Sequence, residues 1–228
     1  MAHKPRIVLL GKQGAGKGTQ AKLLSRHYDI AHLSTGDLFR AQALAGTAFG
    51  LEAKRFMDGG DLVPDEIVMG VIEECLAPGG PLADGFILDG FPRNQLQAEQ
   101  LEQVLTDRPI DVVVHLDVPR EIVVERLSAR RVCENNGAHI YSVNKPPSRG
   151  WICDECGGNV VQRDDDTPAS INKRLDTYER DTRPIREYYR DHGHKVVTVD
   201  GVGEWATSSG SCRRCQLRCA VTERRSPW

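Results

Sequence analysis

Short apolar runs alternate with longer amphipathic segments along most of the chain. The runs are rich in Val, Ile and Leu, as is typical of strands buried on both faces, and they lie at residues 6–10, 30–34, 85–89, 111–117 and 195–199. Between most of them, apolar positions recur with the period of a helix, at residues 17–28, 95–106, 120–131 and 170–190. Strands that alternate with helices predict an α/β fold with a parallel sheet covered on both faces.

Two segments interrupt the alternation. Residues 35–76 contain helix-like pieces and no clear strand, which predicts a small helical insert. Residues 132–162 are rich in Gly, Pro, Asn and Cys, which predicts turns and short strands in a second insert. The expected organisation is a core domain of residues 1–34, 77–131 and 163–204, the two inserts, and an atypical, disordered tail at 205–228.

Composition narrows the class of protein only slightly. The chain has 228 residues, 39% of them hydrophobic, and a formal net charge of −2. A general binder of nucleic acid normally carries an excess of Lys and Arg, so no nucleic-acid partner is expected. No apolar run approaches the roughly 20 residues that span a bilayer, and no signal peptide is evident, so we expect a cytoplasmic protein without a membrane partner.

A glycine-rich loop, GKQGAGKGT at residues 11–19, lies between the first predicted strand and the first predicted helix. Its first seven residues match the phosphate-loop pattern G-x-x-x-x-G-K, although Gly18 separates Lys17 from the hydroxyl of Thr19. Glycines allow consecutive N–H groups to turn toward a phosphate, and the following helix directs its positive end to the same place. The loop therefore predicts a site for the phosphates of a nucleotide.

Later motifs narrow this prediction. LSTGDLFR (33–40) follows the second predicted strand, DGFPRNQLQ (89–97) follows the third, and RLSARR (126–131) precedes QRDDD and NKRL, which contain Arg163 and Arg174. With these motifs in this order, residues 5–203 closely resemble the adenylate kinase family in its long-lid form. The resemblance implies a P-loop NTPase-like core with a five-stranded parallel sheet, a helical insert that binds the nucleoside monophosphate, and a lid. It also implies the reversible reaction of MgATP with AMP to give two ADP.

The resemblance further implies roles for individual residues. ATP would be bound by Gly14, Ala15, Gly16, Lys17, Gly18, Thr19, Arg126 and Arg130. AMP would be bound by Thr35, Arg40, Val63, Gly90, Arg93, Gln97, Arg163 and Arg174, with Gln97 contacting the adenine edge. The catalytic cations around the transferring phosphate would be Lys17, Arg93, Arg126, Arg130, Arg163 and Arg174. Asp89, together with Asp37, would hold Mg²⁺ through water.

The residue types are reasonable for this chemistry in their own right. Phosphoryl transfer depends on positioning and on dispersed positive charge, and guanidinium groups offer paired donors that stay charged. Arg126 and Arg130 are four residues apart, so we expect them on one helix face. Asp89 ends a predicted buried strand, where a carboxylate needs a metal or a cap. Both inserts would close over the nucleotides and exclude water.

Three cysteines of the second insert indicate a structural zinc site. Many members of the family carry C-x2-C-x16-C-x2-C there, whereas this chain has Cys133, Cys153 and Cys156 but Asn136 at the second position. Because zinc prefers four ligands, we expect His139 to complete a Cys3His set. An Asn136 oxygen, a water ligand, or a lid without metal remain alternatives. The cysteines of CRRCQLRC (212–219) fall in the atypical tail.

Two other functions share some of these features. A kinase for UMP, CMP or GMP, or one that uses GTP as donor, would share the phosphate contacts, but Thr35, Gln97 and the long lid favour AMP. A zinc-finger nucleic-acid binder is disfavoured by the near-neutral charge and the incomplete cysteine set. We expect a monomer, because inserts that close need free surface.

Overall fold

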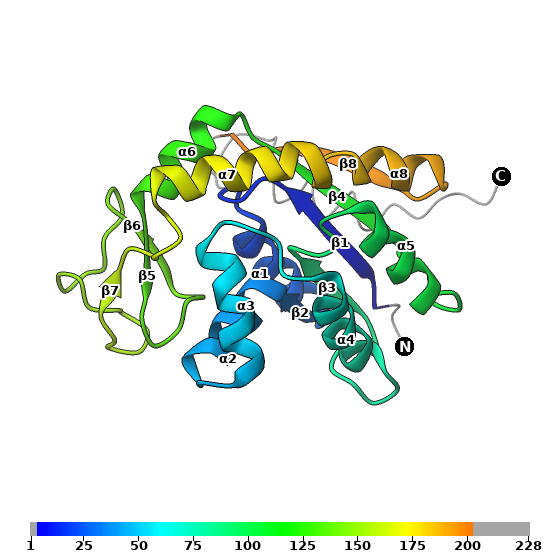
Figure 1. Cartoon of the computed structure of the whole chain (residues 1–228), viewed down its shortest axis with the longest axis horizontal. Coiled ribbons are helices and arrows are strands. Elements are labelled where there is room, and N and C mark those ends of the chain that lie inside the picture. Colours follow the sequence, from blue (N-terminus) through cyan, green and yellow to red (C-terminus); the bar gives the residue numbers. More distant parts are fainter. Residues whose placement is uncertain (1–3, 203–228) are drawn as a thin grey trace.

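A five-stranded parallel sheet forms the centre of the molecule (Figure 1). The computed structural model describes residues 4–202 of the chain. The strands are β1 (Arg6–Gly11), β2 (Ala31–Ser34), β3 (Phe86–Asp89), β4 (Val112–Asp117) and β8 (Val196–Asp200), in the order β2-β3-β1-β4-β8. Every neighbouring pair is parallel, which confirms the predicted α/β class. Their carboxyl ends therefore meet at one edge of the sheet, where ligands bind in open α/β folds.

Helices cover both faces of this sheet. Because side chains alternate along a strand, Ile7 and Leu9 of β1 pack into one apolar cluster while Val8 and Leu10 pack into another. The first cluster is covered by α1 (Lys17–Tyr28), α6 (Arg120–Ala129) and α7 (Pro168–Thr177). The second is covered by α4 (Asp65–Leu76), α5 (Gln95–Val104) and α8 (Ile185–Asp191). The core is thus a three-layer sandwich that holds the loops after β1, β2 and β3 in place.

The long helix expected at 170–190 is not continuous, so this prediction is wrong in its middle. α7 ends at Thr177, a π-helical turn η1 (Tyr178–Thr182) follows, and α8 begins at Ile185. Pro184 has no N–H to donate and cannot occupy a helix interior without disruption. The N–H of Arg183 bonds instead to the carbonyl of Tyr178, which widens the turn just before the proline. Thr182 of this turn becomes available to support the site described below.

Two segments extend beyond the core. The first contains α2 (Thr35–Leu44) and α3 (Ala48–Asp58) and returns to the core through α4, without a strand, as predicted. The second forms a small antiparallel sheet, β6-β5-β7, from β5 (Arg130–Cys133), β6 (Ile140–Ser142) and β7 (Val160–Val161). Figure 1 shows this sheet at one end of the molecule, next to α2 and α3. The exact domain boundaries stay predictions, and the expected tail lies outside the described residues.

No helix within residues 4–202 is long and apolar enough to cross a bilayer.

Candidate active site

The carboxyl edge of the sheet opens into a cavity of about 780 Å³. It is lined by residues from the glycine loop, α2, the loop after β3, α6, the small sheet and α7. Every predicted nucleotide, catalytic and magnesium residue lines this cavity except Ala15, which is fully buried in an apolar core cluster. The structure therefore brings together residues that are up to 160 positions apart in the sequence, from Gly14 to Arg174.

The glycine loop has the backbone that a phosphate site needs. Gly14 and Gly16 have φ values of 80° and 98°, in the left-handed region that favours glycine, and α1 begins directly after Gly16. Lys17 folds back over the loop, and its Nζ donates to the carbonyls of Gly11 at 2.7 Å and Lys12 at 3.0 Å. Burial lowers the pKa of Lys17 to about 8, although the nearby Asp89 carboxylate opposes this shift.

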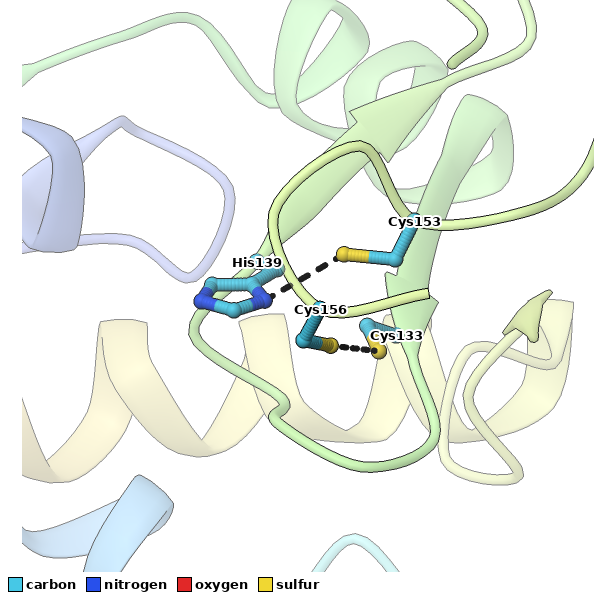
Figure 2. A group of neighbouring side chains, drawn as sticks. All are labelled: Cys133, His139, Cys153 and Cys156. Atoms are coloured by element: carbon cyan, nitrogen blue, oxygen red, sulfur yellow. Dashed lines mark hydrogen bonds between the residues drawn. The ribbon is translucent and has the colours of Figure 1, made fainter. Parts of the chain in front are cut away.

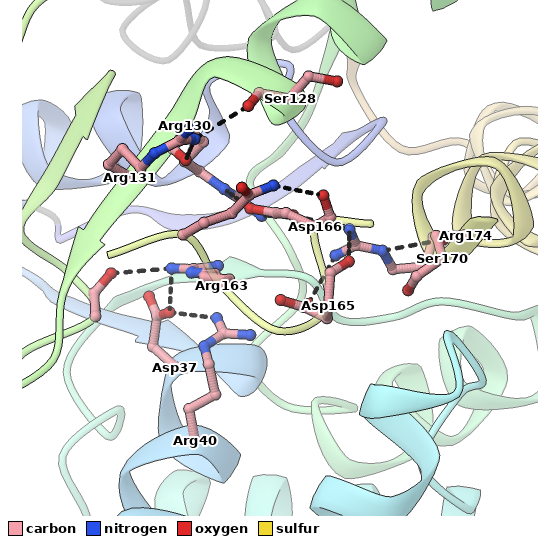
Figure 3. A network of polar contacts seen from close by, with 12 residues as sticks. Asp37, Arg40, Ser128, Arg130, Arg131, Arg163, Asp165, Asp166, Ser170 and Arg174 are labelled. Atoms are coloured by element: carbon pink, nitrogen blue, oxygen red, sulfur yellow. Dashed lines mark hydrogen bonds and ion pairs between the residues drawn. The ribbon is translucent and has the colours of Figure 1, made fainter. Parts of the chain in front are cut away.

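Two of the predicted arginines are held by carboxylates that the sequence prediction did not include. Arg130 binds Asp166 through Nε at 2.8 Å and Nη2 at 2.6 Å, and Arg174 binds the same carboxylate through Nη2 at 3.0 Å (Figure 3). Arg174 also donates to the Asp165 side chain at 2.8 Å. Burial alone raises the pKa of Asp166, but its bonds and charge contacts with Arg130 and Arg174 outweigh burial and lower it. In their present positions these groups form a closed, charge-balanced cluster.

A third predicted arginine, Arg163, connects the two segments beyond the core. Its Nη2 donates to the carbonyl of Gly137 at 2.9 Å and lies 3.7 Å from Asp37, which also pairs with Arg40 (Figure 3). Burial and the neighbouring charges of Arg40 and Arg130 lower the pKa of Arg163 to about 9. Within residues 4–202, the Nε atoms of Arg40 and Arg163 are buried donors without a hydrogen-bond partner. Such donors indicate space for an anion.

The expectation that Arg126 and Arg130 share a helix face is wrong. α6 ends at Ala129, and Arg130 takes the extended conformation that starts β5. The extended conformation is favoured over the helix here because β5 pairs on both sides, with β6 and with β7. Both arginines still reach the cavity, and Arg126 donates to the carbonyl of Gly201 at 2.9 Å.

The loop after β3 supports the other half of the cavity. Its carbonyl at Gly90 accepts from Thr35 Oγ1 at 3.0 Å and from Arg93 Nε at 2.7 Å. Thr182 of the π-helical turn donates to the Arg93 carbonyl at 2.7 Å. Burial lowers the pKa of Arg93, against the opposing charge of Asp89.

The remaining predicted residues of this half are nearly all buried. Gln97 is 1% exposed and its amide bonds to Asp65 and to the N–H of Arg93. Val63 is also buried and lines the cavity. Asp89 is 9% exposed, with one carboxylate oxygen 3.8 Å from His32 Nε2.

The predicted metal ligands also come together. The ligand atoms of Cys133, His139, Cys153 and Cys156 all lie within 4.8 Å of one another (Figure 2). Tetrahedral zinc with Zn–S bonds of about 2.3 Å places its sulfurs about 3.8 Å apart, so the donor set fits this metal. His139 directs Nδ1 to Cys153 at 3.3 Å, and its Nε2 lies 3.2 Å from Glu155.

Asn136 takes a different part in this cluster. Its oxygen accepts from the N–H of Ala138 at 3.0 Å, and its Nδ2 lies 3.1 Å from His139 Nε2. The asparagine therefore supports the histidine as an outer partner, and the geometry favours a Cys3His set over a ligand from Asn136. The carbonyl of Gly137, in the same loop, is the one that holds Arg163.

Sequence reasoning missed Asp65, Asp165 and Asp166. A signal for the last two was present, because the run RDDD places carboxylates beside a predicted catalytic arginine, and arginines buried in a cavity need counter-charges. Asp65 had no comparable signal, since its partner Gln97 is 32 residues away.

A phosphate loop after the first strand of a parallel sheet, an arginine-rich cavity and two inserts around it define a P-loop nucleoside monophosphate kinase. Comparison with known proteins agrees. The family model described as adenylate kinase matches residues 9–194. The adenylate kinase of Streptomyces griseus is 47% identical over 204 residues, covering 88% of this chain and 92% of its own. That of Methanosarcina mazei is 48% identical over 197 residues, covering 86% and 90%. The chain belongs to the adenylate kinase family.

Proposed function

We propose that the protein transfers the γ-phosphoryl group of MgATP to AMP and releases two ADP, in a reversible reaction. The observation that carries this proposal is that the glycine loop and the residues of the predicted AMP site line one cavity, with arginines between them. The relatives that match the chain are named adenylate kinase, which supports AMP over UMP, CMP or GMP as acceptor. Membership of the same family supports ATP over GTP as donor.

In this proposal an oxygen of the AMP phosphate attacks the γ-phosphorus, and the bond to the β–γ bridging oxygen breaks. Lys17 leaves the carbonyls of its own loop and binds donor phosphates together with the loop N–H groups. Arg130, Arg163 and Arg174 exchange carboxylate or carbonyl partners for phosphate oxygens. Each exchange replaces one charge-assisted bond with another, so the guanidinium groups are already positioned when substrates arrive.

Mg²⁺ supplies neutralising charge on the polyphosphate, and Asp89 is the carboxylate best placed to hold its water shell. Asp37 is already engaged by Arg40 and Arg163; burial raises its pKa, but these contacts outweigh burial and lower it. We propose that zinc at Cys133, His139, Cys153 and Cys156 stabilises the lid without taking part in the chemistry. We further propose a cytoplasmic monomer.

Formation of ADP from ATP and each nucleoside monophosphate tests the proposal. We expect AMP to be the preferred acceptor, and Lys17→Ala and Arg93→Ala to lower kcat/KM at least a thousandfold. Arg180→Ala is the matched control, because among the described residues Arg180 pairs only with its neighbour Asp181 at the surface. A wild-type protein that prefers another monophosphate would overturn the assignment.

A further inference from the structure

The amide of Gln97 is held from both ends. Its Oε1 accepts from the backbone N–H of Arg93 at 2.7 Å, and its Nε2 donates to Asp65 Oδ1 at 2.7 Å. Asp65 lies in the first turn of α4, whereas Gln97 lies in the first turn of α5. Gln97 is 1% exposed and lines the wall of the cavity, so no bulk solvent competes for these bonds.

The chemistry of the two partners permits only one orientation of this amide. A backbone N–H can only donate, and an ionised carboxylate can only accept. Turning the amide over would place Oε1 against the carboxylate of Asp65 and Nε2 against the N–H of Arg93. Both bonds would be lost, and like partners would face each other in a buried place, where an unsatisfied polar group is costly.

With its partners among residues 4–202 in place, the fixed amide retains one acceptor and one donor for a ligand. Oε1 has a second lone pair, and Nε2 has a second hydrogen. A 6-aminopurine offers a donor at its amino group beside an acceptor at N1, which matches this pair. A 6-oxopurine offers an acceptor at O6 beside a donor at N1, and would bind only the overturned amide.

We propose that Asp65 is a specificity-determining residue, which selects 6-aminopurine over 6-oxopurine monophosphates by locking the orientation of Gln97. The proposal rests on the proposed role of Gln97 at the acceptor base. Asp65 acts here as a positioning residue, since it contacts the glutamine and not the nucleotide. Asp65 also accepts from Asn94 Nδ2 at 3.0 Å with both oxygens. The side-chain oxygen of Asn94 in turn accepts from the backbone N–H of Gln97 at 2.8 Å and so caps α5. Through Asn94, the Asp65 carboxylate therefore also helps to fix the backbone that carries Gln97.

Asp65→Asn tests the lock, because the variant keeps the size of the side chain but presents a donor as well as an acceptor. IMP is the probe to compare with AMP, since the two differ only at the base edge in question. We expect the ratio of kcat/KM for AMP to that for IMP to fall at least tenfold in Asp65→Asn, with the KM for ATP unchanged. Asp65→Ser removes the same carboxylate with less bulk and is expected to change the ratio in the same direction, should Asp65→Asn fail to fold.

Glu66→Gln is the matched control. Glu66 neighbours Asp65 in the first turn of α4 but is exposed, so its loss removes the same charge from the helix end without touching the glutamine. We expect an unchanged ratio in this variant. A ratio that falls equally in both variants would assign the effect to the charge and overturn the proposal.

Gln97→Ala separates this inference from the proposed function. If the KM for AMP rises at least tenfold in Gln97→Ala while Asp65→Asn keeps the wild-type ratio, Gln97 reads the base and the lock is wrong. If Asp65→Asn lowers the rates with AMP and IMP equally, its role is structural only and the lock is also wrong. An unchanged KM for AMP in Gln97→Ala would overturn both the base contact and the lock.

Discussion

At the scale of single residues, the cavity concentrates cations whose protonation is disfavoured. Burial lowers the pKa of Lys17 to about 8 and that of Arg163 to about 9, and it lowers the pKa of Arg93 as well. Each of them also has arginines among its charged neighbours, which disfavour its charged form, and carboxylates such as Asp89 and Asp37, which favour it. Phosphate groups of two nucleotides would supply the missing negative charge, so binding energy and charge balance come from the same contacts.

The pKa of Lys17 leads to a measurable proton uptake. Free protein loses the Lys17 charge as the pH rises through about 8, whereas bound polyphosphate favours the charged form. Titration calorimetry of ATP binding in two buffers of different ionisation enthalpy should therefore show uptake of roughly half a proton or more at pH 8.5, and little at pH 6.5. Lys17→Met should lose this uptake. Equal uptake in the variant would assign it to another group.

Residue-scale prediction from the sequence worked for the cations and failed for their partners. Lys17 and the arginines were found because their motifs are local and their charge has no use in a core. Asp65 and Asp166 act through side chains 32 and 36 residues away, and a sequence pattern does not show which distant carboxylate a buried arginine or amide will meet.

At the scale of elements, the strands were predictable almost to the residue. The central strands β1, β3 and β4 are apolar runs that are almost fully buried, and such a run between amphipathic segments is typical of a strand in a covered parallel sheet. The break after α7 was harder, because helical periodicity continues across it. Pro184 was the available signal. Arg130 illustrates the same limit, since the pairing of β5 on both sides, and not local propensity, ends α6 at Ala129, two residues before the predicted end.

The metal cluster of the small sheet gives a prediction at this scale. We expect purified protein to contain close to one zinc per chain by elemental analysis. His139→Ala should lose most of the metal and lower the melting temperature of the lid, because three thiolates alone leave the fourth position open. Adding Asn136→Cys to that variant should restore metal content. His27→Ala, on the exposed side of α1, is the control. Wild-type protein without zinc would contradict the assignment.

At the scale of the whole molecule, Asp166 joins three parts of the fold. Its carboxylate is fully buried and binds Arg130, where the chain enters the small sheet, and Arg174, on α7. Asp166 itself lies where the chain returns from that sheet to the core. The entry and the exit of the lid are therefore fastened to each other and to a core helix through one side chain.

Removal of this carboxylate should destabilise the protein. Asp166→Asn leaves two partly buried guanidinium groups without their shared counter-charge, which we expect to cost about 3 kcal/mol in urea unfolding at pH 7. Asp164→Asn, at an exposed carboxylate two residues earlier, should cost less than about 0.5 kcal/mol.

The same difference should depend on pH. The folded pKa of Asp166 lies below its ordinary value of 3.8, so its contribution is complete above that value and is lost as the pH falls further. The stability of wild type should therefore approach that of Asp166→Asn in acid. A gap between the two that stays constant down to pH 2 would contradict this assignment.

The chain enters the small sheet at Arg130 and leaves it near Asp166, and these two residues are paired. The segment between them is therefore suited to replacement by the lid of another protein. A transplant joined after Arg130 and before Arg163 would bring its own metal ligands, or none, while every phosphate-binding guanidinium stayed with the host. Chimaeras of this kind would separate two contributions to the rate. One is the exclusion of water by the lid, and the other is the stabilisation of phosphoryl transfer by the cationic cavity.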